Sequence, residues 1–161
     1  MQATVQQILQ VKGTAVYAVS PAATVDEAVG TMNECGVGSV LVLHDGLVQG
    51  LVSERDILRR VVAQRLDPRD TVVTQIMTRR LWTVTPTTTI QEAMELVTSM
   101  RCRHLPVIGA CGLAGLISSG DLAAWHTGEL HAEVCDLTTY ICGPASSPPP
   151  PSALYALPRV H

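Results

Sequence analysis

The feature that most constrains this fold is an internal repeat with a period of 65 residues. Shifting the chain by 65 positions places GLVSERD at 50–56 on GLISSGD at 115–121, with the glycine, leucine, serine and aspartate unchanged. Further identities follow without any insertion: Val19 with Val84, Pro21 with Pro86, Thr24 with Thr89, Glu27 with Glu92, Ala28 with Ala93, and Val42 with Val107. The 161 residues therefore hold two copies of one supersecondary unit that share a core.

Each copy predicts the same order of elements, β-α-β-β-α. A short apolar strand near residue 15 or 81 ends before a proline, because proline disfavours the helical conformation of the residue preceding it. A T-x-x-E capping box then begins a helix. Two strands follow, and the first pair is joined by an Asp-Gly hairpin turn. A second helix begins at Ser53 or Ser118. The predicted strand pairs are 38–43 with 47–52, and 104–108 with 113–117.

Segments outside the repeated unit complete the predicted organisation. Short helices are expected at 5–10 and 71–78, and a last helix at 129–141 carries an apolar stripe at helical spacing. The residues from 143 onward are rich in proline and serine, which is typical of an extended tail. The expected domains are repeat 1 at 1–70, repeat 2 at 71–142 and a Pro-rich flexible tail at 143–161.

Composition excludes several classes of protein. Apolar residues make up 47% of the chain and charged residues 16%, so a buried core is well supplied. The net charge of -3 argues against a nucleic-acid-binding surface. The N-terminal MQATVQQILQ does not resemble a secretory signal, and no segment approaches the roughly 18 to 20 apolar residues of a membrane helix. We expect a soluble, cytoplasmic protein with no nucleic-acid and no membrane partner.

The cysteines do not indicate a disulfide framework or a metal centre. There are five, with no CxxC pair, which fits reduced thiols. Cys102, His104 and Cys111 could meet around a metal, but their spacing matches no zinc pattern. We therefore predict no metal ligands.

The repeated Ser-x-x-Asp has two interpretations. It is a capping box in its own right, with serine as N-cap and aspartate three residues later. It also follows an aliphatic strand at the start of a helix, where free backbone N–H groups and the helix dipole suit a phosphate. A carboxylate accepts hydrogen bonds only, and so matches the two hydroxyls of a ribose. The residues concerned are Ser53, Asp56, Ser118 and Asp121.

The motifs taken in order resemble the tandem CBS-domain family, whose paired unit is called a Bateman module. GLVSERDILRR and GLISSGDL resemble its strand-turn-helix motif, RHLPVIG at 103–109 its central strand, and LTTYICG the C-terminus of small stand-alone bacterial members. The resemblance implies an α/β (α+β) fold in which two pseudo-symmetric β-α-β-β-α repeats pack sheet to sheet, with two clefts between them. It also implies pairing into a homodimer.

Members of that family can hold AMP, ATP, NAD or S-adenosylmethionine in these clefts. The resemblance therefore implies an adenosine-containing effector and no required cofactor. Asp56 and Asp121 would hold the ribose, and Ser53 and Ser118 would approach the phosphate. Lys12 resembles a position that approaches the ligand in related stand-alone modules.

The two copies are not equivalent at the expected sites. Arg55 aligns with Gly120, while Arg103 and His104 align with Gly38 and Ser39. Arginine suits bidentate phosphate binding, and His104 could contact a base or sugar. We therefore expect the two clefts to bind with unequal affinity.

Three functions can be compared on the sequence. The leading one is a regulatory module that senses an adenine nucleotide and acts on an unidentified effector protein or on dimer assembly. The alternative is a structural or protein-interaction module with no nucleotide ligand. Catalysis is not expected, because the chain shows no nucleophile elbow, no P-loop, and no acid and base at catalytic spacing.

Overall fold

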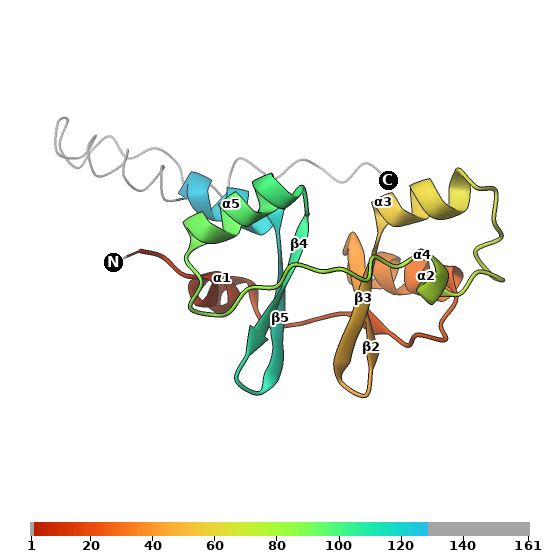
Figure 1. Ribbon diagram of the computed structural model, residues 1–161, viewed down its shortest axis with the longest axis horizontal. Helices are drawn as coiled ribbons and strands as arrows, with labels where there is room; N and C mark the ends of the chain where they lie inside the picture. The colour runs from red at the N-terminus through yellow and green to blue at the C-terminus, as the bar shows by residue number, and fades with distance from the viewer. Residues whose placement is uncertain (1, 129–161) are drawn as a thin grey trace. The chain divides into compact units, whose positions relative to one another are not determined.

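The computed structural model describes residues 2–128 (Figure 1). The helix expected at 129–141 and the tail expected at 143–161 lie outside the described residues. The chain divides into two compact units, Met1–Ser119 and Gly120–His161. All the named strands lie in the first unit, and residues 119–128 are helical.

The first repeat forms a three-stranded sheet in the order β1-β2-β3. Its strands are β1 (Ala18–Val19), β2 (Ser39–His44) and β3 (Leu47–Ser53). β1 is parallel to β2, and β2 is antiparallel to β3. The turn between β2 and β3 has φ of 50° at Asp45 and 76° at Gly46, and two consecutive positive φ angles are what a tight Asp-Gly hairpin requires. The predicted hairpin is confirmed.

The second repeat reproduces this hairpin with β4 (His104–Gly109) and β5 (Gly112–Ser118). Ser39 pairs with Ser53 and His104 pairs with Ser118, so the registers are related by the same shift of 65 residues. The register irregularity also recurs, after Val42 in one hairpin and after Val107 in the other.

The strand expected near residue 81 is reduced to one parallel bridge between Val84 and Val107. Pro106 explains the difference. In the first repeat the backbone N–H of Leu41 donates to the carbonyl of Tyr17 at 3.0 Å. The shift of 65 makes Pro106 the counterpart of Leu41, and proline has no N–H to donate to residue 82. The ladder therefore stops at Val84.

Six helical segments precede β4, and a further helix occupies 119–128. The segments are α1 (Val5–Lys12), α2 (Val25–Cys35), α3 (Glu54–Ile57), the π-helix η1 (Leu58–Val62), α4 (Val73–Ile76) and α5 (Ile90–Met100). α4 is shorter than the 71–78 expected. The capping boxes of α2 and α5 are confirmed, because Thr24 and Thr89 each accept a bond from the N–H of the glutamate three residues on and each donate their own N–H to its carboxylate.

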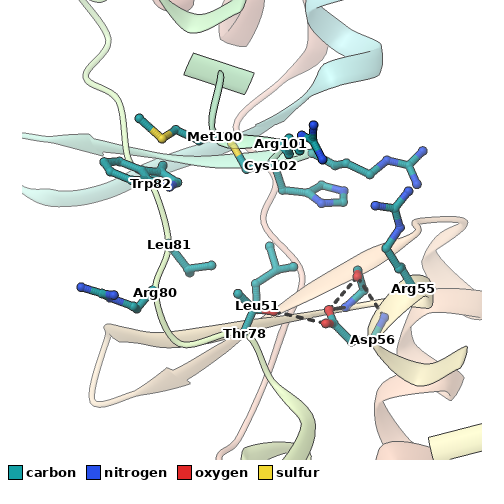
Figure 2. A pocket seen from close by; sticks show the side chains of 13 residues that line it. Leu51, Arg55, Asp56, Thr78, Arg80, Leu81, Trp82, Met100, Arg101 and Cys102 are labelled. Carbon is teal, nitrogen blue, oxygen red and sulfur yellow. Dashed lines mark hydrogen bonds between the residues drawn. The ribbon is translucent and has the colours of Figure 1, made fainter. Parts of the chain in front are cut away.

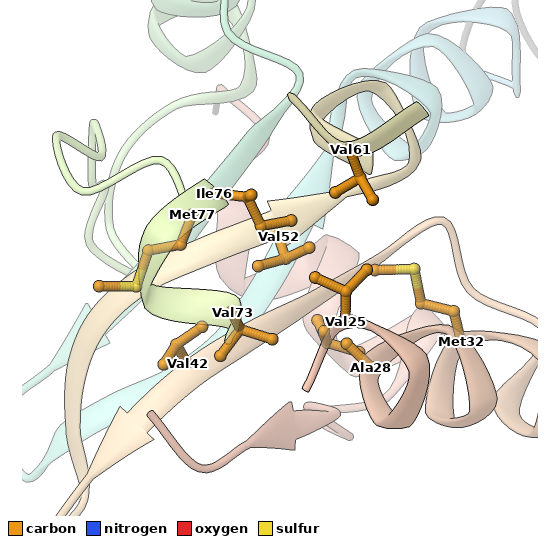
Figure 3. Close-up of a cluster of buried hydrophobic side chains, with 10 residues drawn as sticks. Val25, Ala28, Met32, Val42, Val52, Val61, Val73, Ile76 and Met77 are labelled. Atoms are coloured by element: carbon orange, nitrogen blue, oxygen red, sulfur yellow. The ribbon is translucent and has the colours of Figure 1, made fainter. Parts of the chain in front are cut away.

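A hydrophobic core lies on the first sheet (Figure 3). Side chains of α2, β2, β3, η1 and the segment from α4 to Met77 form it: Val25, Ala28, Met32, Val40, Val42, Val52, Val61, Val73, Ile76 and Met77. β2 is buried at four consecutive residues, 39–42, so both of its faces are covered. β3 also contacts β5 of the other repeat, and the two repeats pack sheet to sheet as expected.

The glycine of each repeated phrase has a packing role. A Cβ atom at Gly50 would lie 2.7 Å from Met77 Sδ and 2.9 Å from the carbonyl oxygen of Thr78. A Cβ atom at Gly115 would lie 2.8 Å from a terminal methyl of Leu9. At Gly50 the close atoms include a backbone oxygen, so a larger residue there would push the segment 77–78 away from the hairpin; at Gly115 the close atoms all belong to the flexible side chain of Leu9.

No helix among the described residues has both the length and the apolar character needed to cross a membrane.

Candidate functional site

Two clefts in the first unit are lined by residues that the 65-residue shift relates. The Asp56 cleft has a volume of about 240 Å³, and the Ser118 cleft has a volume of about 170 Å³. The Asp56 cleft is lined by Leu51, Ser53, Arg55, Asp56, Thr78, Arg80, Leu81, Trp82, Met100, Arg101, Cys102, Arg103 and His104. The Ser118 cleft is lined by Lys12, Ala15, Val16, Tyr17, Val37, Gly38, Ser39, His104, Leu116 and Ser118.

Each cleft combines the end of one repeat's hairpin with two segments of the other repeat. In the Asp56 cleft, the end of β3 faces 80–82 and 100–104. In the Ser118 cleft, the end of β5 faces 15–17 and 37–39. Because the shift of 65 maps 15–17 onto 80–82 and 37–39 onto 102–104, the two clefts are duplicates with the roles of the repeats exchanged.

In the Asp56 cleft, apolar side chains lie opposite the Asp56 carboxylate. Figure 2 shows Leu81, Trp82 and Met100 on one side, and Asp56 and Arg55 on the other. Trp82 is 48% exposed, which is high for a tryptophan in a folded domain. An exposed aromatic ring beside polar groups is suited to stacking on a flat ligand.

Four arginines line this cleft: Arg55, Arg80, Arg101 and Arg103. Among the described residues, none of the four side chains makes an ion pair or a hydrogen bond, whereas Arg60 and Arg69 are paired with aspartates. The single carboxylate lining the cleft is that of Asp56. The excess of cationic groups favours an anionic ligand.

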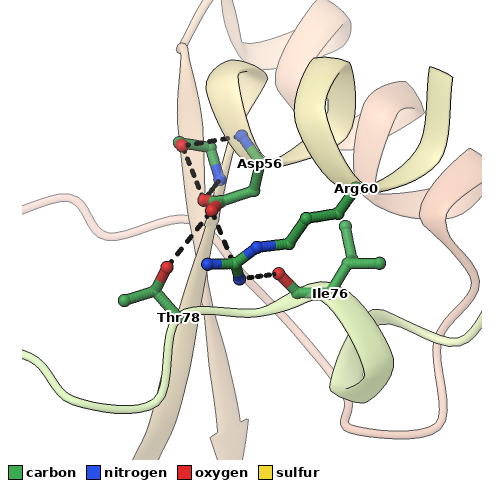
Figure 4. A network of polar contacts seen from close by, with 5 residues as sticks. Asp56, Arg60, Ile76 and Thr78 are labelled. Carbon is green, nitrogen blue, oxygen red and sulfur yellow. Dashed lines mark hydrogen bonds and ion pairs between the residues drawn. The ribbon is translucent and has the colours of Figure 1, made fainter. Parts of the chain in front are cut away.

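The Asp56 carboxylate is held by a polar network (Figure 4). Its Oδ2 accepts hydrogen bonds from the Ser53 N–H at 3.0 Å and from the Ser53 hydroxyl at 2.6 Å. Its Oδ1 accepts one from the Thr78 hydroxyl at 3.2 Å and lies 3.4 Å from the guanidinium of Arg60. The side chain of Asp56 is 12% exposed. The capping box expected at Ser53–Asp56 is confirmed.

A carboxylate offers about four acceptor positions, and three are used by these hydrogen bonds. One position on Oδ1, beside the Arg60 guanidinium, accepts no hydrogen bond from the described residues and is available to a hydroxyl donor. A ribose diol that donates twice to Oδ1 would have to take the place of Thr78.

The predicted site residues fall into three groups. Ser53, Arg55, Asp56, Arg103 and His104 line the Asp56 cleft. Lys12, His104 and Ser118 line the Ser118 cleft, where Lys12 Nζ donates to the carbonyl of Leu116 at 3.0 Å. Asp121 lies in the second unit, within the helical residues 119–128, and is half-buried.

Sequence reasoning did not single out Thr78, Arg80, Leu81, Trp82, Met100 or Arg101 as lining residues. The shift of 65 relates 80–82 to 15–17, so the sequence predicts that these two segments occupy equivalent positions in the two repeats. The pattern does not say that these segments line the cleft of the opposite repeat.

Cys102 is the thiol that lines the Asp56 cleft. Burial raises the pKa of this thiol, which keeps it protonated and poorly nucleophilic at neutral pH. Among residues 2–128, no group of three His, Cys, Asp or Glu side chains is arranged to hold a metal ion.

The fold and the duplicated clefts agree with the comparisons to known proteins. The family model for the CBS domain matches twice, at residues 10–63 and 73–127. This chain belongs to the CBS-domain family, as a tandem pair.

The similar proteins include plant and bacterial members. The mitochondrial CBS domain-containing protein CBSX3 of Arabidopsis thaliana is 39% identical over 125 residues, which cover 74% of this chain and 61% of that protein. A protein from Burkholderia ambifaria, provisionally named as a signal-transduction protein with CBS domains, is 39% identical with a TM-score of 0.74. The match covers 77% of this chain and 93% of that one.

A third match is a hexameric CBS-CP12 protein from bloom-forming cyanobacteria. It is 26% identical with a TM-score of 0.69, and the match covers 91% of this chain and 93% of that chain.

Proposed function

We propose that this protein is a regulatory module that binds an adenine nucleotide, principally in the Asp56 cleft, and signals through a change of conformation or of dimer assembly. The observation that carries the proposal is the combination of groups that line that cleft. An aromatic and apolar side faces a half-buried carboxylate, and four arginines are distributed around the cleft. An adenine base, a ribose and a phosphate present the complementary groups.

Each residue has a role in this arrangement. Trp82 and Met100 face the base, Asp56 Oδ1 accepts a ribose hydroxyl, and Ser53 with Arg55 and Arg103 approaches the phosphate. His104, which lines both clefts, contacts the base or sugar. In the Ser118 cleft, Lys12 and Ser118 have the corresponding roles. AMP, ATP, NAD and S-adenosylmethionine are the ligands considered, and no further cofactor is needed.

The signal follows from the construction of the clefts. A ligand that contacts both repeats binds more tightly to the conformation in which both walls of the cleft are in place. It therefore shifts the population toward that conformation. The output is a change in a homodimer or in the binding of an effector protein. Support for assembly comes from the hexameric CBS-CP12 relative, which shows that members of this fold form oligomers.

The proposed role is not catalytic. The thiol in the cleft is held protonated by burial. The hydroxyl of Ser53 donates directly to Asp56, so its proton goes to a carboxylate and not to an imidazole.

The proposal is tested by isothermal titration of the full chain with AMP, ADP, ATP, NAD and S-adenosylmethionine. The key variant is Asp56→Asn. The matched control is Glu27→Gln, because Glu27 is the carboxylate of a capping box that lies outside both clefts. We expect micromolar binding that Asp56→Asn weakens at least tenfold, since a hydrogen bond to a charged group contributes about 1.5 to 3 kcal/mol. Glu27→Gln should bind as the wild type does.

The second candidate is a protein-interaction module that binds no nucleotide. Two observations favour it: Ser53 and Asp56 complete a capping box without a ligand, and Leu58, Val62 and Leu66 are exposed beyond it. Silence across the whole nucleotide panel, from folded protein freed of carried-over ligand, would select this candidate.

A further inference from the structure

Arg60 is a residue to which neither the repeat pattern nor the family motif gives a role. It follows Asp56 by four residues, on the helical segment that continues α3, and its guanidinium lies 3.4 Å from Asp56 Oδ1. The same nitrogen donates to the carbonyl oxygen of Ile76, the last residue of α4. One side chain therefore joins the aspartate of the first repeat to the segment that links the repeats (Figure 4).

The residues after Ile76 carry this connection into the cleft. Thr78 exchanges both backbone hydrogen bonds with Leu51, at 2.8 and 3.0 Å, and donates its hydroxyl to Asp56. Two residues further on, Arg80 begins the wall formed by 80–82. The order along the chain is therefore the Arg60 contact, the Thr78 contact, and then the wall that faces Asp56.

The connection belongs to one cleft only. In the repeat alignment Arg60 corresponds to Trp125, and Thr78 corresponds to Gly13. A glycine offers no hydroxyl, and an indole carries no positive charge. The second repeat therefore cannot build the same bridge from its equivalent positions.

We propose that Arg60 is a positioning residue for the Asp56 cleft, and that it acts through Asp56. It keeps the carboxylate and the linking segment together, so that the ribose acceptor and the wall of 80–82 face the ligand as one unit. A ribose diol that donates twice to Oδ1 takes the place of the Thr78 hydroxyl, and this displacement makes the segment 76–78 sensitive to ligand. The inference rests on the proposed nucleotide site for its ligand, but the bridge itself is present without one.

A double-mutant cycle tests the inference on the full chain. The variants are Arg60→Met, Asp56→Asn and the double variant, with Arg59→Met as control because Arg59 is exposed on the same segment and lines neither cleft. The probe is AMP in isothermal titration. We expect Arg60→Met to weaken AMP binding about tenfold in the wild-type background and to add no further loss in the Asp56→Asn background. Arg60→Lys should recover part of the affinity, and Arg59→Met should change nothing.

Hydrogen exchange supplies a readout that does not depend on nucleotide binding. Without any ligand, Arg60→Met should increase exchange at the amides of Met77 and Thr78, while the amides of β2 exchange as in the wild type. AMP should alter exchange at 77–78 in the wild type.

The outcomes separate the two claims. An equal loss of AMP affinity from Arg60→Met in both backgrounds, or unchanged exchange at 77–78, would overturn the positioning role while leaving the nucleotide site intact. If the wild type binds no nucleotide, the proposed function fails, and increased exchange at 77–78 in Arg60→Met still supports the bridge. If Arg60→Met does not fold, Arg60→Lys and Thr78→Val are compared by the same exchange measurement. Unchanged exchange at 77–78 in both variants would reject the positioning role of Arg60.

Discussion

The Asp56 cleft and the Ser118 cleft share one backbone plan and differ in the side chains placed on it. Arg103 and Arg101 of the Asp56 cleft stand where the other repeat has Gly38 and Gly36. Likewise, Arg80 replaces an alanine and Trp82 replaces a tyrosine. The Ser118 cleft is smaller, and its one lysine donates to a backbone carbonyl.

The two copies therefore share a backbone frame, and a few side chains give the two clefts different chemistry. Hairpin register, capping boxes and the close-packed glycines are common to both copies. The cationic groups are concentrated in one cleft. A single ligand class is therefore not expected to bind both clefts equally.

The largest expected effect on stability is the difference between alanine substitutions at Gly50 and at Gly115. Gly50→Ala should lower the free energy of unfolding by about 1 to 3 kcal/mol, because the new methyl group meets the backbone carbonyl of Thr78, which cannot move aside. Gly115→Ala should cost less, because it meets the flexible end of Leu9. Urea unfolding of both variants measures the difference. An equal loss would mean that the two hairpins are packed alike.

A smaller effect concerns Arg101. It ends α5 with φ of 51°, and its counterpart Gly36 ends α2 with φ of 64°. A left-handed conformation costs a non-glycine residue about 1 kcal/mol. Arg101→Gly should therefore stabilise the protein by about that amount, and it should also weaken nucleotide binding if the arginine serves the cleft. Thermal unfolding and ADP titration of the same variant test both. Greater stability with unchanged affinity would remove Arg101 from the site.

The smallest effect is on acid stability in the second repeat. Hydrogen bonds from the Thr89 N–H and then from its hydroxyl hold the pKa of Glu92 below its ordinary value of 4.5. Because the folded-state pKa is depressed, the stabilisation is present above the ordinary value and is lost as pH falls through the folded-state value. Glu92→Gln should reduce the loss of unfolding free energy on acidification. Urea unfolding between pH 3 and pH 6 measures this loss, because these limits lie about one unit or more on either side of the ordinary pKa of a glutamate. The same loss in both proteins would contradict this.

Local patterns in the sequence predicted much of the fold. The T-x-x-E boxes, the Asp-Gly turn and the Ser53–Asp56 cap each depend on residues close in the chain, and the structure contains all three. Other features depend on contacts between distant residues. The short edge at Val84 follows from the missing N–H of Pro106, which is apparent only once the strands are paired.

The candidate site was predictable in part for the same reason. The repeated phrase identified Ser53 and Asp56, and the repeat alignment identified Arg55, Arg103 and His104. The resemblance implied clefts between the repeats, but the sequence did not reveal which segments form the second wall, and so it missed Trp82 opposite Asp56. Nor did it reveal the bridge from Arg60 to Ile76, because a backbone carbonyl leaves no mark in the sequence.

An ADP titration shows most directly whether the nucleotide binds in the Asp56 cleft or in the Ser118 cleft. It compares wild type with the double variant Arg55→Met/Arg103→Met and with Lys12→Met, which removes the lysine of the other cleft. We expect one strong site per chain, weakened at least tenfold by the double variant and unaffected by Lys12→Met. Loss of binding in Lys12→Met with full binding in the double variant would contradict it.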